Sequence, residues 1–268
     1  MTTMARLRGG AGRTVALVCA ALAPAAMADD LLPHRAVFDL GLASARGSGG
    51  VVDVQGRMTV EFTDVCDGWT LDQRLVLDIS YDDEETYRSI SAFVSWESKD
   101  GTRFRFEDRT WHDARLVEEI SGEATLEAIG GRGSATLSKP KAQTIALPAG
   151  TMFPTRHTAY LIERAFAGDS YILRTMFDGT SIEGPVDIGA AMGKARAAPE
   201  QPPVPGDRTA WPMRLAFFLP DGEPDRPSFE IGVLLQANGV ARGMVMDYGG
   251  YAIDAELSRF EALAPPDC

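Results

Sequence analysis

Apolar and polar residues alternate over long stretches of this 268-residue chain, and a period of two is typical of half-buried β-strands. One side of each stretch is apolar and the other carries Asp, Glu, Arg and Thr. This pattern predicts antiparallel strands with one face in solvent. The clearest predicted strands are residues 37–42, 56–62, 71–79, 87–96, 104–107, 211–219, 229–236, 240–248 and 251–260.

Tight turns separate the last three of these predicted strands. Asn238-Gly239 and Gly249-Gly250 supply the positive φ angles that two-residue hairpin turns require. The sequence therefore predicts an all-β fold, a many-stranded antiparallel meander. A single helix cannot cover the whole face of such a sheet, so the sheet must close, roll up or stack on itself.

One segment departs from the period of two. Residues 155–167 have apolar residues at helical spacing, with Thr155 placed to cap a helix and Gly168 placed to end it. The predicted helix lies at an open end of a barrel or in the concave face of a curved sheet. The apolar stripe expected to pack on the sheet is Ala159, Ile162 and Phe166.

The N-terminus has the three parts of a secretory signal. Three arginines and no acidic residue precede an Ala-rich apolar run at 14–25, which ends in Ala26-Met27-Ala28. We expect cleavage after Ala28, leaving residues 29–268 as the mature periplasmic protein. A membrane anchor is the alternative, but the run is short and Pro24 interrupts it.

Cysteine count supports export. Cys19 lies in the signal segment, which leaves Cys66 and Cys268 in the mature chain. Two cysteines in an exported chain usually pair, so we predict one disulfide between them, with two free thiols as the alternative. The bridge would close a very long loop, and the chain-entropy model gives roughly 5 kcal/mol as an upper estimate of its stabilisation.

Charge excludes some partners. The full chain has a net charge of −12, and loss of the three signal arginines makes it −15. A surface this acidic argues against nucleic acid and anionic lipid head groups. It identifies no ligand.

A Pro-rich segment at residues 197–206 interrupts the strand pattern. Proline this dense cannot pair inside a sheet, so we predict an exposed loop between strands. A domain boundary is the weaker interpretation. A disulfide from Cys66 to Cys268 would span both sides of the segment, so we expect 29–268 to be a single domain.

No pattern in the chain indicates catalysis or a metal site. The three histidines, His34, His112 and His157, are not at metal-ligand spacing, and no Gly-x-Ser-x-Gly motif is present. The acidic run 82–85 lacks the residue spacing of a calcium-binding loop, and we interpret it as a solvated turn. The glycine-rich run 130–134 lacks the Lys-Ser/Thr of a phosphate loop and is interpreted as a hairpin turn.

A membrane-spanning outer-membrane barrel would also show short alternating strands. Aromatic residues make up only 8% of the chain, which makes two interfacial girdles hard to build. Charges also fall on both faces of several predicted strands. We therefore expect a protein that does not span the membrane.

The ordered set of short motifs resembles a known family, the alphaproteobacterial periplasmic envelope-integrity protein B family, once a domain of unknown function. The resemblance spans nearly the whole predicted mature chain. The motifs are LPHRAVFDL at 32–40, CDGW at 66–69, FPTRH at 153–157, FDG at 177–179, WP at 211–212, NGV at 238–240, MDY at 246–248 and the terminal Cys268.

This resemblance implies a spiral or incompletely closed β-barrel with a disulfide at Cys66 and Cys268. It implies a periplasmic protein that supports the cell envelope, with no known catalytic activity. We also expect no cofactor. We expect a non-enzymatic protein that binds an envelope component or a periplasmic partner, through residues that the sequence does not identify. The alternatives are a lipid or lipoprotein acyl-chain carrier with a concave apolar face, and an uncharacterised periplasmic hydrolase.

Overall fold

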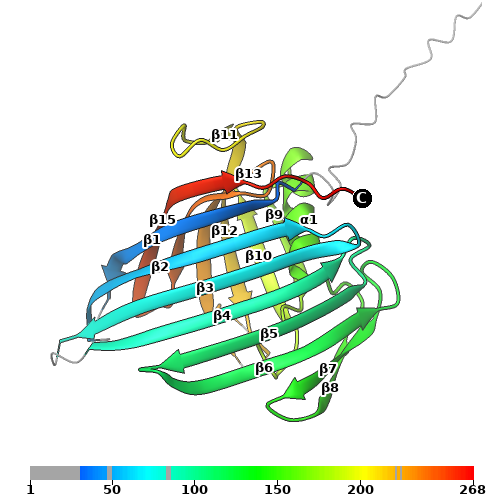
Figure 1. Ribbon diagram of the computed structural model, residues 1–268, viewed down its shortest axis with the longest axis horizontal. Helices are drawn as coiled ribbons and strands as arrows, with labels where there is room; N and C mark the ends of the chain where they lie inside the picture. Colours follow the sequence, from blue (N-terminus) through cyan, green and yellow to red (C-terminus); the bar gives the residue numbers. More distant parts are fainter. Residues whose placement is uncertain (1–30, 47–49, 83–85, 221, 224) are drawn as a thin grey trace, which may run out of the picture.

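The computed structural model describes residues 31–46, 50–82, 86–220, 222–223 and 225–268, so the predicted signal at 1–28 lies outside the described residues. The described residues form one α-helix, α1 (Pro154–Phe166), and one sheet (Figure 1). The strands are β1 (His34–Ala45), β2 (Val51–Asp64), β3 (Gly68–Tyr81), β4 (Thr86–Ser98), β5 (Arg103–His112), β6 (Arg115–Leu126), β7 (Gly133–Lys139), β8 (Gln143–Leu147), β9 (Tyr171–Met176), β10 (Val186–Met192), β11 (Arg196–Ala197), β12 (Thr209–Phe218), β13 (Phe229–Gln236), β14 (Ala241–Asp247) and β15 (Tyr251–Ala262).

Sequential strands pair in antiparallel fashion, and β1 pairs with β15. The order is β8-β7-β6-β5-β4-β3-β2-β1-β15-β14-β13-β12-β10-β9, with β11 beside β12. The sheet rolls up but does not close, because β8 and β9 are its two ends (Figure 1). The segment between β8 and α1 runs beside the open edge of β9, where the N–H of Met152 donates to the carbonyl of Thr175 at 3.0 Å. The predicted spiral or incompletely closed barrel is confirmed.

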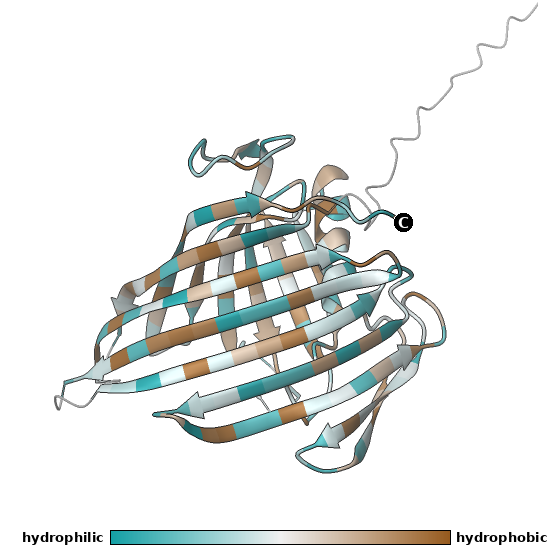
Figure 2. Cartoon of the chain, viewed as in Figure 1, coloured by the Kyte–Doolittle hydropathy of each residue, from teal (hydrophilic) through white to brown (hydrophobic). Residues whose placement is uncertain are grey.

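Hydrophilic and hydrophobic residues alternate along the strands (Figure 2), and burial alternates with them. In β1 the side chains of Ala36, Phe38 and Leu40 are buried, whereas those of Arg35 and Asp39, on the opposite face, are exposed. The buried residues join inward residues of the neighbouring strands in one apolar cluster. On the outer face, ion pairs cross between strands, as from Arg35 to a glutamate of β2.

Helix α1 lies within the curve of the sheet, near one end of the roll (Figure 1). Its buried face, Leu161, Ile162 and Ala165, joins a cluster with Trp69 of β3 and Trp211 of β12. Because these strands come from opposite sides of the roll, the helix fills the space between two walls. The observed bounds lie one residue before the predicted 155–167.

Two details of the helix prediction are wrong. Phe166, expected in the buried stripe, is 55% exposed, because it is the last residue of α1 and contact with Trp211 of β12 covers only part of its ring. Thr155 was expected to cap the helix. The N-cap residue is instead Phe153, whose side chain makes no capping hydrogen bond. Gly168, with φ of +84°, lies just past the helix end as predicted.

The exposure of Phe166 changes the expected effect of removing it. Its ring still contacts Trp211 edge-to-face, with centroids 4.7 Å apart. Phe166→Ala should therefore lower the free energy of unfolding by about 1 kcal/mol, the value of an aromatic pair, and not the ~3 kcal/mol of a buried phenylalanine. Urea unfolding of this variant and of Phe166→Tyr, which keeps the ring, measures the difference. A loss near 3 kcal/mol for the alanine variant would show that the side chain is core.

No helix in the described part of the chain is long and apolar enough to cross a membrane. The Pro-rich segment forms the mostly exposed connection from β11 to β12, as predicted. The run 130–134 spans the turn from β6 to β7 and the start of β7. Asp82 follows β3, and the rest of the acidic run 82–85 lies outside the described residues.

Candidate functional site

The interior of the roll contains an apolar cavity of about 210 Å³. Inward residues of β1, β2, β3 and β14 line it, together with the first turn of α1 and the turn between β13 and β14. Several of these inward apolar side chains, including Val60, Leu71 and Met244, are only half-buried. The interior is therefore not completely filled by the protein's own side chains.

The polar groups that line this cavity are uncharged. Gln73 and the hydroxyl of Thr158 face it, and the hydroxyl already donates to the carbonyl of Pro154 at 3.0 Å. His34 also lines it, and its Nδ1 lies 2.7 Å from the carbonyl oxygen of Leu32. Burial lowers the pKa of His34, which favours the neutral ring. Among the residues that the structure describes, no Asp, Glu, Lys or Arg lines the cavity.

Glu97, at the end of β4, holds the N-terminus of α1 beside this cavity. The backbone N–H groups of Thr155 and Arg156 donate to its two carboxylate oxygens, at 2.7 and 2.8 Å. Only 2% of Glu97 is exposed. Burial raises the pKa of Glu97 to about 7, although the two N–H donors favour the charged form. This contact replaces the cap predicted at Thr155.

His157 is buried inside the first turn of α1. It is 4% exposed, and its Nε2 has no hydrogen-bond partner among the described residues. Burial lowers the pKa of His157 to about 4, and the positive charge of Arg174 adds to this effect. The ring is therefore neutral at neutral pH and has a structural position in the core.

The lowered pKa of His157 predicts acid sensitivity. The folded-state pKa of about 4 lies below the unfolded value of 6.5, so the contribution to stability is complete above pH 6.5 and is lost as the pH falls towards 4. Between pH 7 and 4.5 this loss amounts to about 2 kcal/mol. His157→Gln should therefore lose about 2 kcal/mol less than wild type over this interval, measured by urea unfolding.

The matched control is His112→Gln, because His112 is exposed at the end of β5. This control measures how much the same substitution changes the acid dependence at an exposed position. Comparison of variants removes the opposite contributions of buried carboxyl groups such as Glu97, which titrate alike in all three proteins. Equal acid loss in wild type and His157→Gln would contradict the buried neutral ring.

A second buried carboxyl group lies on the inner face of β5. Asp108 is 7% exposed, and burial raises its pKa to about 6, with further increases from the charges of Glu118 and Asp178. In the sheet, Asp108 pairs with Phe93, and Phe93 pairs with Gln73 at the cavity. The inner wall therefore changes from apolar to acidic over two strands.

The structure contains the predicted disulfide between Cys66 and Cys268, whose Cα atoms are 5.9 Å apart. Cys66 lies in the turn from β2 to β3 and has φ of +69°, an unusual value for a residue with a side chain. The chain beyond β15 runs past the ends of β1 and β2 to reach it, and the N–H of Leu263 donates to the carbonyl of Pro33. The bridge thus attaches the last residues to the turn between β2 and β3.

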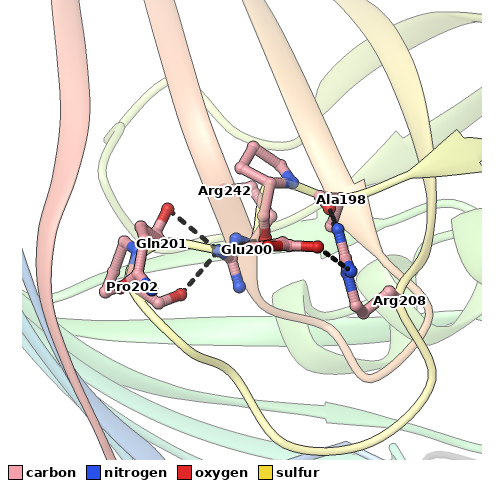
Figure 3. Close-up of polar contacts among 7 residues, drawn as sticks. Ala198, Glu200, Gln201, Pro202, Arg208 and Arg242 are labelled. Atoms are coloured by element: carbon pink, nitrogen blue, oxygen red, sulfur yellow. Dashed lines mark hydrogen bonds and ion pairs between the residues drawn. The ribbon is translucent and has the colours of Figure 1, made fainter.

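Two arginines hold the Pro-rich loop (Figure 3). Arg242 of β14 is 7% exposed, and its Nη2 donates to the carbonyls of Pro199 at 2.9 Å and Pro202 at 2.7 Å. Arg208 donates to the carbonyl of Ala198 at 2.6 Å. Val204 packs from this loop onto the apolar cluster of the sheet. The loop is therefore fixed over part of the interior.

The sequence profile of the EipB-like family matches residues 25–264. The chain belongs to this family. A relative is the "Cell envelope integrity protein EipB" of Brucella abortus (strain 2308), which is 35% identical over 249 residues that cover 90% of this chain and 88% of the relative. A crystal structure of a β-barrel-like protein of a domain of unknown function from Brucella abortus superposes with a TM-score of 0.80. It is 34% identical and covers 87% of this chain and 99% of its own.

Within this family fold, the sequence located the disulfide but not the interior groups. The three histidines lie on three different elements: His34 on β1 at the cavity, His112 on β5 and His157 on α1. Sequence reasoning missed Glu97, Gln73 and Asp108. Glu97 adjoins the predicted strand 87–96, and Gln73 takes the place of an apolar residue between Leu71 and Leu75. A charged residue at an inward position of the alternation is the signal that could have found Asp108.

Proposed function

We propose that this protein is exported to the periplasm and supports cell-envelope integrity there by binding, without catalysis. The bound species is an envelope component or a periplasmic protein. The observation that carries the proposal is the 35% identity, over 90% of the chain, to a protein named for cell envelope integrity. The N-terminal signal pattern supports export, and the disulfide suits an oxidising compartment.

A strain that lacks the gene tests this proposal. Loss of the protein should reduce growth on detergent or on a cell-wall antibiotic, and the gene with its signal segment should restore growth. The same gene without residues 1–28 should fail to restore it. Normal growth of the strain without the gene, under all such stresses, would overturn the proposal.

Binding and catalysis predict different results for single titratable residues. Binding energy spreads over a surface, whereas catalysis depends on a few groups. We expect His112→Gln and Asp108→Asn to protect the envelope almost as well as wild type, at matched protein levels in the same growth assay. Abolished protection by either variant, with an unchanged melting temperature, would favour an enzyme and identify the residue to study first.

Specific observations favour the two alternatives. The apolar interior cavity favours an acyl-chain carrier, whose binding site would be preformed. The raised pKa of Asp108, near two other carboxyl groups, favours a hydrolase, because perturbed carboxyl groups often serve as general acids or bases. Asp108→Asn distinguishes the hydrolase from both binding functions.

A further inference from the structure

The half-buried state of inward apolar side chains marks the cavity as a binding space. A small barrel usually fills its interior with side chains. Here Val60 of β2, Leu71 of β3 and Met244 of β14 point inward, line the cavity and remain partly accessible to solvent. Apolar surface left in contact with water has a free-energy cost that an apolar ligand would remove.

The size of the cavity suits one chain. An apolar cavity of about 150 Å³ is large enough to hold benzene. The cavity of about 210 Å³ has room for a segment of one alkyl chain, and not for two chains side by side. The solvent-accessible side of the cavity would let the far end of a longer chain extend outward.

Neutral residues around the cavity and acidic residues further along the inner wall favour an uncharged head group over an anionic one. The polar groups at the cavity are neutral, among them Gln73, Thr158 and His34, so a buried carboxylate or phosphate would find no cationic partner. Two strands beyond Gln73, Asp108 is buried on the same inner wall. Its charge, with those of Glu118 and Asp178, would repel an anionic head group.

We infer that the interior cavity binds one acyl chain of a single-chain lipid with an uncharged, hydroxyl-bearing head group, of the monoacylglycerol class. The head group would accept and donate hydrogen bonds at Gln73 and Thr158, and the chain would cover Val60, Leu71 and Met244. This inference rests on the proposed binding function and names its ligand class.

Isothermal titration of the purified mature protein tests the inference, with monolauroylglycerol as the probe below its micelle concentration. We expect one molecule to bind per chain, and dodecanoate, the same chain with an anionic head, to bind at least tenfold more weakly. Val60→Phe, which places a ring in the cavity, should weaken binding of monolauroylglycerol at least tenfold. Leu71→Trp is a second filling variant, in case the first does not fold.

Val52→Phe is the matched control, because Val52 lies on the same strand but is 55% exposed on the outside. It should bind like wild type. Absence of binding by wild type, equal binding by Val60→Phe that is correctly folded, or equal affinity for dodecanoate would each overturn the inference. Growth of strains that carry these variants tests the proposed function separately. A Val60→Phe variant that loses the lipid but still protects the envelope would assign protection to another surface.

Discussion

Replacing Cys268 with serine should lower the free energy of unfolding by up to about 5 kcal/mol and the melting temperature by roughly 10 °C or more. The disulfide joins residues 202 positions apart, so its loss releases a very long loop in the unfolded chain. In the folded chain, residues 263–268 form no strand and would lose their attachment to the turn at Cys66. Urea unfolding and calorimetry measure the loss.

The fold itself should survive this change, because the sheet buries several apolar clusters without the bridge. Cys66→Ser should have the same effect, and the double variant should lose no more than either single variant, since all three break the same bond. A loss below about 1 kcal/mol, or thiol labelling of two cysteines in the native protein, would contradict the prediction.

Glu97→Ala should lower the free energy of unfolding by about 3 kcal/mol at pH 8, where its carboxyl group is ionised. The substitution leaves the N–H groups of Thr155 and Arg156 buried without their acceptor and creates a cavity at the start of α1. The loss should be local as well, so that amide exchange in α1 accelerates more than exchange in β1 and β15.

Glu97→Gln separates charge from packing. Glutamine fills the same volume and keeps one acceptor oxygen, but its amide group faces the second N–H. Its loss should therefore lie between zero and that of the alanine variant. If both variants match wild type in stability and in the exchange of α1, the carboxylate does not hold the helix.

The alternation was enough to predict the strands near both ends of the chain, but it failed in the middle. The burial of β10 alternates except at Gly189, which lies against the side chain of Tyr171. Its sequence, VDIGAAM, has a single charged residue among small and apolar ones, so no polar–apolar period of two appears. β6 begins with a run of exposed residues and carries Glu118 and Glu119 together. Neighbours that are distant in sequence decide the burial of such strands.

Helical periodicity predicted the existence and place of α1, but not the extent of its contact. Ala159 and Ile162 are buried and Phe166 is not, although all three lie on one stripe. A stripe gives the direction that faces a partner, whereas the length of the covering surface depends on the sheet. The cap from Glu97 was equally out of reach, because 58 residues separate it from Thr155.

The cavity could not be predicted, because it is the difference between the enclosed volume and the summed volume of the inward side chains. Val60 and Leu71 are ordinary apolar residues in an alternating pattern. Whether they leave a space depends on the curvature of the sheet and on the position of α1. The disulfide was predictable since the parity of two cysteines leaves a single pairing.

Because β1 pairs with β15, the sheet can be completed only after the last strand of the chain has been made. Each of the strands β2 to β8 can add to its predecessor as the chain emerges, but one edge of β1 waits for a strand made more than 200 residues later. Until then β1 is an open edge that a neighbouring chain could extend. Cys268 follows β15 in the chain, so it meets Cys66 only after β15 has been made. Formation of this disulfide therefore indicates that β15 has paired with β1, so that the edge of β1 is no longer open to a neighbouring chain.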